Sequence, residues 1–465
     1  MSDSTAIRPL RVAVIGAGPA GVYAADLLLK SKEVSSGERP VTVDVFDRYP
    51  APWGLIRYGV APDHPRIKGI VNALHKVMER SEIRFFGNVD FGADADLAFF
   101  KTYYDAVIFA TGAVKDADLD IPGIDAEGSF GGADFVSWYD GHPDVERTWD
   151  LSAKEVAVIG NGNVALDVAR VLSKHADDLL TTEIPANVYE GLKSSQVTDV
   201  HVFGRRGPAQ VKFTPLELRE LSHSRDVDIV LYEEDFEFDD ASDEAIKTNN
   251  QVKTMVNTLT NWLVEDQDSG ASRRLHLHFL HSPKEILTDE SGKVRGMAFE
   301  RQELDGTGNV RSTGETVEYP LQAVYRAVGY FGSEVDGLEF DSRRGVLPND
   351  GGHVLDAAGE PVPGVYATGW IKRGPVGLIG HTKSDASETV GMLLEDADAL
   401  YTAEKPEEDA IVAALRERGI AFTTWEGWQK LDAHEKALGT EGEWPVERER
   451  VKVVDRDEMV SISTS

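Results

Sequence analysis

The stretch VAVIGAGPAG, residues 12–21, decides the fold of this chain. Its four leading apolar residues predict a buried parallel strand, its glycines predict a tight turn, and the apolar spacing of Val22 to Lys30 predicts a helix. Such a turn directs backbone N–H groups and a helix N-terminus at a phosphate. In this fingerprint Gly16 permits the turn, Gly18 lets a pyrophosphate approach the backbone, and Gly21 lets the helix pack closely on the strand.

A second copy of this pattern, VAVIGNGNVA at residues 156–165, repeats the strand and the glycine turn and leads into a predicted helix from Leu166 to His175. Chance repetition of strand, turn and helix together is improbable. Two dinucleotide sites in one chain indicate one tightly held cofactor and one exchangeable cofactor, which favours a flavin and a nicotinamide.

Composition excludes several classes of protein. With 465 residues, 41% of them hydrophobic, the chain is too long for one typical domain. It contains no cysteine, which excludes a disulfide framework, a redox dithiol and an iron–sulfur cluster held by its own thiolates. The formal charge of 48 − 80 = −32 argues against general binding to nucleic acid or anionic membranes. No apolar run reaches the roughly 18 residues of a membrane span, so we expect a cytoplasmic protein.

In the first half, the strand predicted from Val41 ends at Asp47, whose carboxylate is placed to accept hydrogen bonds from ribose hydroxyls. The alternative is a solvated aspartate at a strand end. The loop PAPWGLIRYGVAPDHP, residues 50–65, is unusually apolar and suits the wall of a flat ring. It contains His64 between two prolines, as either a structural or a catalytic residue. An amphipathic helix is predicted from Ile67 to Arg80.

In the second half, the strand Asp199–Phe203 is followed by Arg205 and Arg206, and no acidic residue stands where NAD would need one. Two guanidiniums there suit the 2′-phosphate of NADP, and the alternative is a basic pair on the surface. Next, Thr214 predicts a helix N-cap with Glu217 three residues after it. This spacing is that of a capping box, which gives Glu217 a structural role at the start of the helix. Glu220, on the same helix, is typical of a solvated face.

Beyond this helix, the segment from Tyr232 to Glu244 is strongly acidic and predicts an exposed loop or edge. The alternating stretches 275–280 and 294–300 predict a small antiparallel meander. The glycine-rich stretch 374–380 then leads into a predicted helix, whose N-terminus suits the anionic edge of a reduced flavin. We therefore expect an α/β fold with two Rossmann-like dinucleotide-binding domains, built from parallel sheets with helices. An FAD-binding domain (1–115 and 326–400) is interrupted by an NADP-binding domain (116–325), and residues 401–465 form a charged helical extension.

Four stretches together resemble the adrenodoxin-reductase-like branch of the ferredoxin–NADP reductases: GLIRYGVAPDHP (54–65), GNVALDVAR (162–170), GRRGP (204–208) and GWIKRGP (369–375). The resemblance covers roughly residues 10 to 400. It implies that FAD contacts Pro19, Ala20, Asp47, Leu55, Phe91, Trp370, Gly377, Leu378 and Ile379. It implies that NADP contacts Asn161, Gly162, Asn163, Val164, Arg205, Arg206 and Glu217, with Gly377 near both cofactors and with His64 and Glu220 near the contact between flavin and nicotinamide.

The resulting hypothesis is an FAD enzyme that transfers electrons between NADPH and a ferredoxin, with hydride transfer between NADP and flavin and single electrons passed to the iron–sulfur partner. We expect a monomer that needs no metal and binds no nucleic acid. The alternatives are an NADPH oxidoreductase for a small quinone-like acceptor, and a non-catalytic NADP(H)-binding sensor or electron-input subunit. Because ferredoxins are acidic and this chain is too, docking requires a local basic patch, for which Lys372, Arg373 and Arg66 are the candidates.

Overall fold

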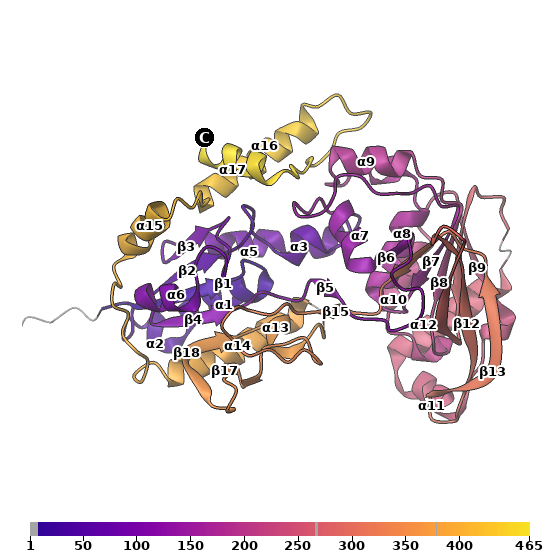
Figure 1. Ribbon diagram of the computed structural model, residues 1–465, viewed down its shortest axis with the longest axis horizontal. Helices are drawn as coiled ribbons and strands as arrows, with labels where there is room; N and C mark the ends of the chain where they lie inside the picture. The colour runs from indigo at the N-terminus through magenta and orange to yellow at the C-terminus, as the bar shows by residue number, and fades with distance from the viewer. Residues whose placement is uncertain (1–7, 266–267, 378) are drawn as a thin grey trace, which may run out of the picture. The chain divides into compact units, whose positions relative to one another are not determined.

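The chain forms two compact units in a computed structural model that describes residues 8–265, 268–377 and 379–465 (Figure 1). The first unit contains the chain up to Val60, then His64–Lys115 and Tyr330–Ser465, and the second contains Ala61–Asp63 and Asp116–Gly329. The second unit therefore interrupts the first in sequence. Both units are built on parallel sheets with helices, which confirms the predicted α/β class.

The sheet of the first unit has the strand order β16-β17-β18-β4-β1-β2-β3, and its five strands from β18 to β3 run parallel. Strand β1 pairs with β2 from Leu10↔Val41 to Ile15↔Phe46, and every residue of β1 is buried, as its apolar run predicts. The strands are β1 Leu10–Ile15, β2 Val41–Phe46, β3 Ile83–Phe86, β4 Ala106–Phe109, β16 Asn349–Asp350, β17 His353–Leu355 and β18 Pro361–Ala367.

Helices α1 and α14 pack together in this unit, and their apolar faces join one core with the strands. The predicted helix from Ile67 to Arg80 is wrong as a single element, because the chain turns at Gly69 between α4 and α5. The helices are α1 Pro19–Lys30, α2 Lys32–Ser35, α3 Leu55–Tyr58, α4 Pro65–Lys68, α5 Val71–Met78, α6 Leu97–Tyr103, α13 Trp370–Arg373 and α14 Ile379–Glu395.

The C-terminal residues belong to the first unit. They contain α15 Glu408–Glu417, α16 Trp425–Thr440 and α17 Arg456–Thr464, and α16 and α17 lie side by side at the yellow end of the chain in Figure 1. Trp428, Leu431, Val453 and Met459 are buried in the same core as β1 and α1. This segment is therefore a packed part of the first unit and not only a charged extension.

The main sheet of the second unit is fully parallel, with the order β6-β14-β7-β8-β10-β9. Its strands are β6 Ser129–Gly131, β7 Glu155–Ile159, β8 Asp199–Phe203, β9 Val227–Leu231, β10 Arg273–His278 and β14 Ala323–Arg326. Its helices are α7 Gly132–Tyr139, α8 Asn163–Ser173, α9 Ala186–Lys193, α10 Pro215–Leu221, α11 Asp240–Thr248 and α12 Asn250–Val264.

A smaller antiparallel sheet in the second unit contains β11 His281–Thr288, β12 Val294–Leu304 and β13 Val310–Tyr319. The predicted meander is therefore half right. The stretch 294–300 lies in β12, but 275–280 contributes to β10, which pairs in parallel with β8 and β9 and is continuously buried from Leu275 to His278, as is typical of a parallel strand. The short strands β5 Lys115–Asp116 and β15 Tyr330–Phe331 pair where the chain leaves and re-enters the first unit. No helix among the described residues is long and apolar enough to span a membrane.

Candidate functional site

The first glycine turn connects β1 to α1, and its three glycines serve different purposes. A Cβ on Gly16, whose φ is +114°, would lie 2.4 Å from the carbonyl oxygen of Ala110, and a Cβ on Gly21 would lie 2.0 Å from the carbonyl oxygen of Gly16. A Cβ on Gly18 would meet only the Cα of Gly54, at 3.8 Å. Gly16 and Gly21 are therefore required by the fold, whereas the missing side chain of Gly18 leaves a space where a pyrophosphate can approach the N-terminus of α1.

Asp47 lies directly after β2 and is buried beside this turn. Its Oδ2 accepts a hydrogen bond from the N–H of Ala17 at 2.8 Å, and its Oδ1 accepts one from the N–H of Tyr49 at 3.0 Å. Burial raises the pKa of Asp47 to about 6. Each carboxylate oxygen has two lone pairs, so the acceptor capacity for a ribose hydroxyl remains after these two bonds.

The loop before α3 lies against the same turn. The N–H of Trp53 donates to the carbonyl oxygen of Ala17 at 2.9 Å, and a Cβ on Gly54 would lie 3.1 Å from the Cα of Gly18. Leu55 begins α3 immediately after this contact and is partly exposed. The structure thus brings the start of α3 next to the Gly18 turn, although Leu55 and Gly18 are far apart along the chain.

The remaining predicted FAD residues lie on several elements of the first unit. A Cβ on Gly369 would lie 2.6 Å from the Cβ of Ala20, so the start of α13, where Trp370 stands, touches the first turn of α1, which begins at Pro19. Phe91 instead packs among aromatic core residues, with ring centroids 4.9 Å from Phe109 and 5.6 Å from Phe100. Gly377 is exposed with φ +89° just before α14, whose first residue is Ile379, and Leu378 lies outside the described residues.

The second glycine turn connects β7 to α8 in the second unit. A Cβ on Gly160, whose φ is +142°, would lie 2.2 Å from the carbonyl oxygen of Ala327, whereas a Cβ on Gly162 would meet nothing within 4 Å. The turn is held by the carbonyl oxygen of Asn161, which accepts from the N–H groups of Lys212 and Phe213 at 2.9 and 3.1 Å. This turn therefore also has one glycine that the fold requires, Gly160, and one glycine with free space around it, Gly162. It leads through Asn163 and Val164 into α8.

Arg205 and Arg206 follow β8, the neighbour of β7 in the sheet. The N–H of Gly204 donates to the carbonyl oxygen of His278 at 2.9 Å, and the N–H of Leu280 donates to the carbonyl oxygen of Arg206 at 3.2 Å, so the backbone of the pair is fixed. Arg205 is exposed and Arg206 is partly exposed. Within the described part of the chain neither guanidinium has a hydrogen-bond or ion-pair partner, which leaves both available for a phosphate.

Glu217 and Glu220 both lie on α10. Thr214 caps this helix by accepting from the N–H of Glu217, and the N–H of Thr214 donates to Oδ1 of Asn163 at 2.9 Å, which ties α10 to the second glycine turn. The predicted cap is confirmed, and Glu217 is buried. Glu220 is partly exposed, with one oxygen 3.5 Å from Nδ1 of His223. His64, in the first unit, is buried and precedes α4, where its carbonyl oxygen accepts from the N–H groups at positions 67 and 68.

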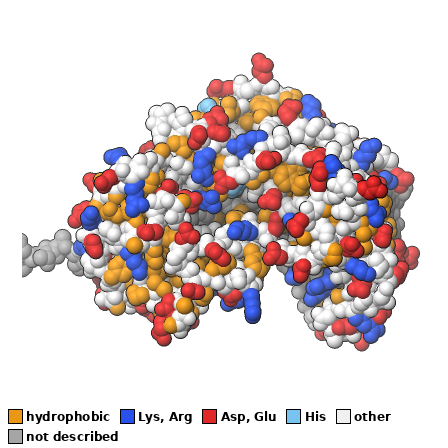
Figure 2. Space-filling model, viewed as in Figure 1, with side chains coloured by type: hydrophobic (Ala, Val, Ile, Leu, Met, Phe, Trp, Pro, Cys, Tyr) orange, Lys and Arg blue, Asp and Glu red, His pale blue; other side chains and the backbone are white. Residues whose placement is uncertain are grey.

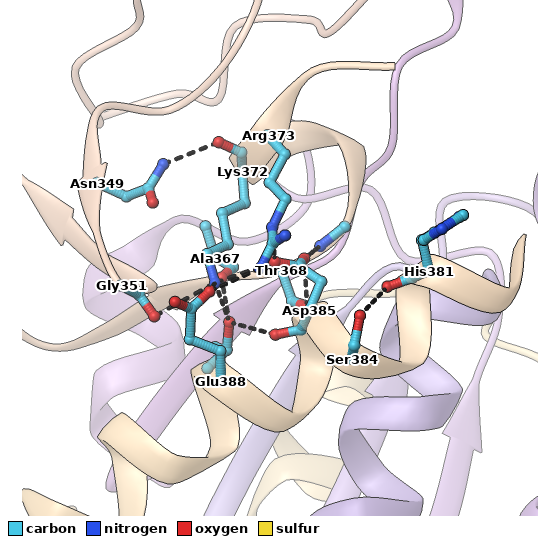
Figure 3. Close-up of polar contacts among 12 residues, drawn as sticks. Asn349, Gly351, Ala367, Thr368, Lys372, Arg373, His381, Ser384, Asp385 and Glu388 are labelled. Atoms are coloured by element: carbon cyan, nitrogen blue, oxygen red, sulfur yellow. Dashed lines mark hydrogen bonds and ion pairs between the residues drawn. The ribbon is translucent and has the colours of Figure 1, made fainter. Parts of the chain in front are cut away.

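The proposed basic docking patch is wrong for Lys372. Its side chain is only 3% exposed and pairs with Asp385 at 3.1 Å and Glu388 at 2.7 Å. Arg373 is about half exposed and pairs with the same two carboxylates (Figure 3). Two acidic residues of α14 thus neutralise both cations. On the face shown in Figure 2, acidic and basic side chains are interspersed, and Arg66 stays exposed on α4.

Sequence reasoning did not identify Arg170 as a site residue. This fully buried arginine of α8 pairs with Asp63 at 2.8 Å and with Asp167 at 2.9 Å. Lys174 also pairs with Asp63, at 2.5 Å, and these cations hold the pKa of that carboxyl far below its usual range despite its burial. They attach Ala61–Asp63 to the second unit. The only local signal was the i, i+3 spacing of Asp167 and Arg170.

The acidic segment 232–244 is mostly exposed or partly exposed, as predicted, but Asp235 is an exception, because it is buried next to His278 and His281. These three side chains have the chemistry of metal ligands, but Nη1 of Arg301 lies 2.5 Å from Oδ1 of Asp235 and 3.1 Å from Nδ1 of His281. Arg301 therefore supplies the positive charge at this place. Burial lowers the pKa of His281 to about 4 and raises that of Asp235 to about 6.

The residues present fit two dinucleotides. In each unit a glycine with no Cβ contact within 3.5 Å stands at the N-terminus of a helix. In the second unit two arginines that pair with none of the described residues follow the adjacent strand. FAD and NADP(H) have the pyrophosphates that such turns hold. Only NADP(H) carries the 2′-phosphate that the arginines suit.

Comparison with known proteins agrees with this geometry. Residues 10–379 match the family model described as pyridine nucleotide-disulphide oxidoreductase. The NADPH-ferredoxin reductase FprA of Mycobacterium tuberculosis is 41% identical, with 98% of this chain and 99% of that protein covered. The mitochondrial NADPH:adrenodoxin oxidoreductase of Arabidopsis thaliana is 36% identical, with 96% of this chain and 94% of that protein covered.

The solved structure of FprA from Mycobacterium tuberculosis in complex with NADPH superposes with a TM-score of 0.88 at 38% identity, covering 98% of this chain and all of that one. A family whose members bind FAD and a nicotinamide accounts for the two glycine turns. The chain belongs to the pyridine nucleotide-disulphide oxidoreductase family, in the branch that includes FprA and adrenodoxin reductase.

Proposed function

We propose that this protein is a ferredoxin–NADP(+) reductase, an FAD enzyme that transfers electrons between NADPH and a ferredoxin-type iron–sulfur protein. The observation that carries the proposal is the pair of open glycine turns, one per unit, with two arginines beside the second that have no side-chain partner in the described part of the chain. The names of the relatives, NADPH-ferredoxin reductase and NADPH:adrenodoxin oxidoreductase, support the same reaction and partner class.

When bound, FAD supplies the step between the two-electron chemistry of NADPH and the one-electron chemistry of an iron–sulfur partner. The chain's own residues bind and orient. We propose that Gly18 and the start of α1 hold the FAD pyrophosphate, that Asp47 accepts from its ribose, and that Leu55 and Trp370 contact the flavin. We also propose that FAD lies near Phe91, whose partly buried ring packs on Phe100 and Phe109.

For NADP(H), we propose that residues 161–164 hold the pyrophosphate and that Arg205 and Arg206 hold the 2′-phosphate. Glu217 and Glu220 come from the helix that is tied to this turn by the bond between Thr214 and Asn163. Hydride transfer needs alignment and no general acid, so His64 and Glu220 are proposed to position the cofactors.

NADPH-driven reduction of cytochrome c, measured with and without added ferredoxins, tests this proposal. We expect the rate to depend on ferredoxin and to be much lower with NADH. A visible spectrum with flavin bands that NADPH bleaches separates an enzyme from an NADP(H)-binding sensor. A rate with quinones that ferredoxin does not exceed would instead identify the small-acceptor oxidoreductase.

The proposal includes the oligomeric state of the protein and its location in the cell. We propose a monomer, and size-exclusion chromatography with light scattering tests it. We propose a cytoplasmic location, supported by the lack of a membrane-spanning helix among the described residues, and cell fractionation tests it. A ferredoxin should dock through a basic surface other than Lys372.

A further inference from the structure

The C-terminal segment, residues 424–459, is attached by contacts of several kinds to residues 53–58. This stretch consists of Trp53, Gly54 and the short helix α3, and we call it the Trp53–Tyr58 loop. The Trp53 ring packs edge-to-face on Trp425 and Trp428, with ring centroids 5.8 and 6.2 Å apart. Nζ of Lys452 donates to the carbonyl oxygen of Arg57 at 2.6 Å. All of these residues belong to the first unit. The segment thus covers the side chains and the backbone of the loop.

Glu435 of α16 is the centre of this attachment. Its carboxylate is fully buried and accepts from both terminal nitrogens of Arg57, with Oε2 3.0 Å from Nη1. It also accepts from Nη1 of Arg450 at 3.2 Å and from the N–H of Val453 at 3.0 Å. One carboxylate therefore joins Arg57 to the extended residues that lead into α17, and this carboxylate itself is shielded from solvent.

The loop needs such support because its backbone is strained. Trp53 has φ +89°, a left-handed conformation that is unfavourable for a bulky residue, and Gly54 follows with φ +50°. Conformations of this kind persist only where the surrounding structure holds them, and they concentrate at functional sites. Here the surrounding structure includes the C-terminal segment, through Trp425 and Trp428.

The strained residues are those that meet the first glycine turn. The N–H of Trp53 donates to the carbonyl oxygen of Ala17 at 2.9 Å, and Gly54 approaches Gly18 so closely that an added Cβ would lie 3.1 Å from its Cα. Displacement of this loop would therefore change the space beside Gly18. That space is where we place the FAD pyrophosphate.

We propose that Glu435 is a positioning residue for FAD: acting through Arg57, it holds the Trp53–Tyr58 loop against the Gly18 turn, so that the C-terminal segment sets the affinity for the flavin. This inference rests on the proposed FAD site. It gives a role to residues 424–459, which have no dinucleotide fingerprint of their own.

The test compares FAD affinity in full-length Glu435→Gln with that of the wild type, by fluorescence titration after removal of the flavin. Gln keeps the shape of the side chain but removes the negative charge that pairs with Arg57, whereas Arg450 keeps its ion pair with Asp432 at 2.7 Å. We expect the Kd for FAD to rise at least tenfold and the visible circular dichroism of the flavin at saturation to change. The Kd for NADP+, a ligand of the second unit, should stay within twofold.

Two controls separate positioning from general stability. Glu426→Gln makes the same charge change on an exposed residue of α16, and Val365→Ala removes buried volume from the core in β18; both should leave the Kd for FAD within twofold. Lys452→Met removes the hydrogen bond to the carbonyl oxygen of Arg57 together with a buried ammonium charge, and it should raise the Kd two- to fivefold, which keeps the test decisive if Glu435→Gln does not fold. An unchanged Kd in Lys452→Met, or in a folded Glu435→Gln whose Tm falls like that of Val365→Ala, would overturn the inference. A wild-type chain that binds no FAD would overturn the proposed function instead.

Discussion

Removing both guanidiniums of Arg205 and Arg206 should convert a strong preference for NADPH into indifference. Neither side chain has a partner among the described residues, so their replacement by Ala breaks no contact that the fold uses. The turn itself is held by backbone bonds from Gly204 and Leu280, which Ala keeps. The loss should therefore fall on the 2′-phosphate alone.

The size of the effect follows from two charge-assisted hydrogen-bonding groups, each worth about 1.5–3 kcal/mol. Arg205 is exposed, so solvent screens its contribution, and the two effects are not additive because both groups bind one phosphate. We take the lower end, about 3 kcal/mol in total, which is roughly a hundredfold in kcat/KM for NADPH at about 1.4 kcal/mol per decade.

The assay is steady-state reduction of ferricyanide with NADPH and with NADH, at fixed ionic strength. For NADH, kcat/KM should stay constant or rise slightly, since no phosphate is lost. Arg311→Ala is the matched control, because this exposed arginine of β13 pairs with the surface residue Glu303 and should change neither value. Equal losses with both nucleotides would mean that the arginine pair is structural, and no loss with NADPH would mean that the second nucleotide site is misassigned.

Three further outcomes are expected. Gly18→Ala should leave the Tm of the apoprotein within about 2 °C of the wild type but weaken FAD binding. Gly21→Ala should prevent stable folding, because its Cβ would lie 2.0 Å from a backbone oxygen. Thermal melts that show the same Tm for both variants would contradict this. Lys372→Met should lower the Tm by several degrees and leave the salt dependence of ferredoxin reduction unchanged, because the cation is buried against two carboxylates; a flattened salt dependence would return this residue to the docking surface. Burial lowers the pKa of His281 to about 4, so at intermediate pH the unfolded chain binds a proton that the folded chain does not, and stability is lost as the pH falls from about 6.5 toward 4. Between pH 7 and pH 5 the free energy of unfolding of His281→Phe should therefore fall by about 2 kcal/mol less than that of the wild type, as measured by denaturant titration. An equal fall in both proteins would refute the assignment.

Local sequence pattern was sufficient where structure depends on near neighbours. The two strand–turn–helix units, the Thr214 cap and the position of the arginine pair after β8 all follow from residues within one short stretch. Apolar runs, glycine turns and capping residues encode these features because strand, turn and helix each form from adjacent residues. The cofactor classes could therefore be predicted before any contact was known.

Burial and long-range pairing were decided by tertiary structure. From sequence, Lys372 was predicted to be a surface cation. It is buried because α14 brings the carboxylates of Asp385 and Glu388 against it. Asp235 lies in an acidic stretch and is buried because Arg301, 66 residues later, compensates its charge.

The attachment of the C-terminal segment shows the same limit most clearly. Glu435 meets Arg57 across 378 residues of chain, and no periodicity or motif connects them. What the sequence by itself determined is the pair of nucleotide-binding turns, since adjacent residues form them. The tertiary structure alone decided which residues hold the first turn and its neighbouring loop in place, because distant segments must pack into one core before they can meet. The partners of a buried charge depend on proximity in space and not on proximity in sequence.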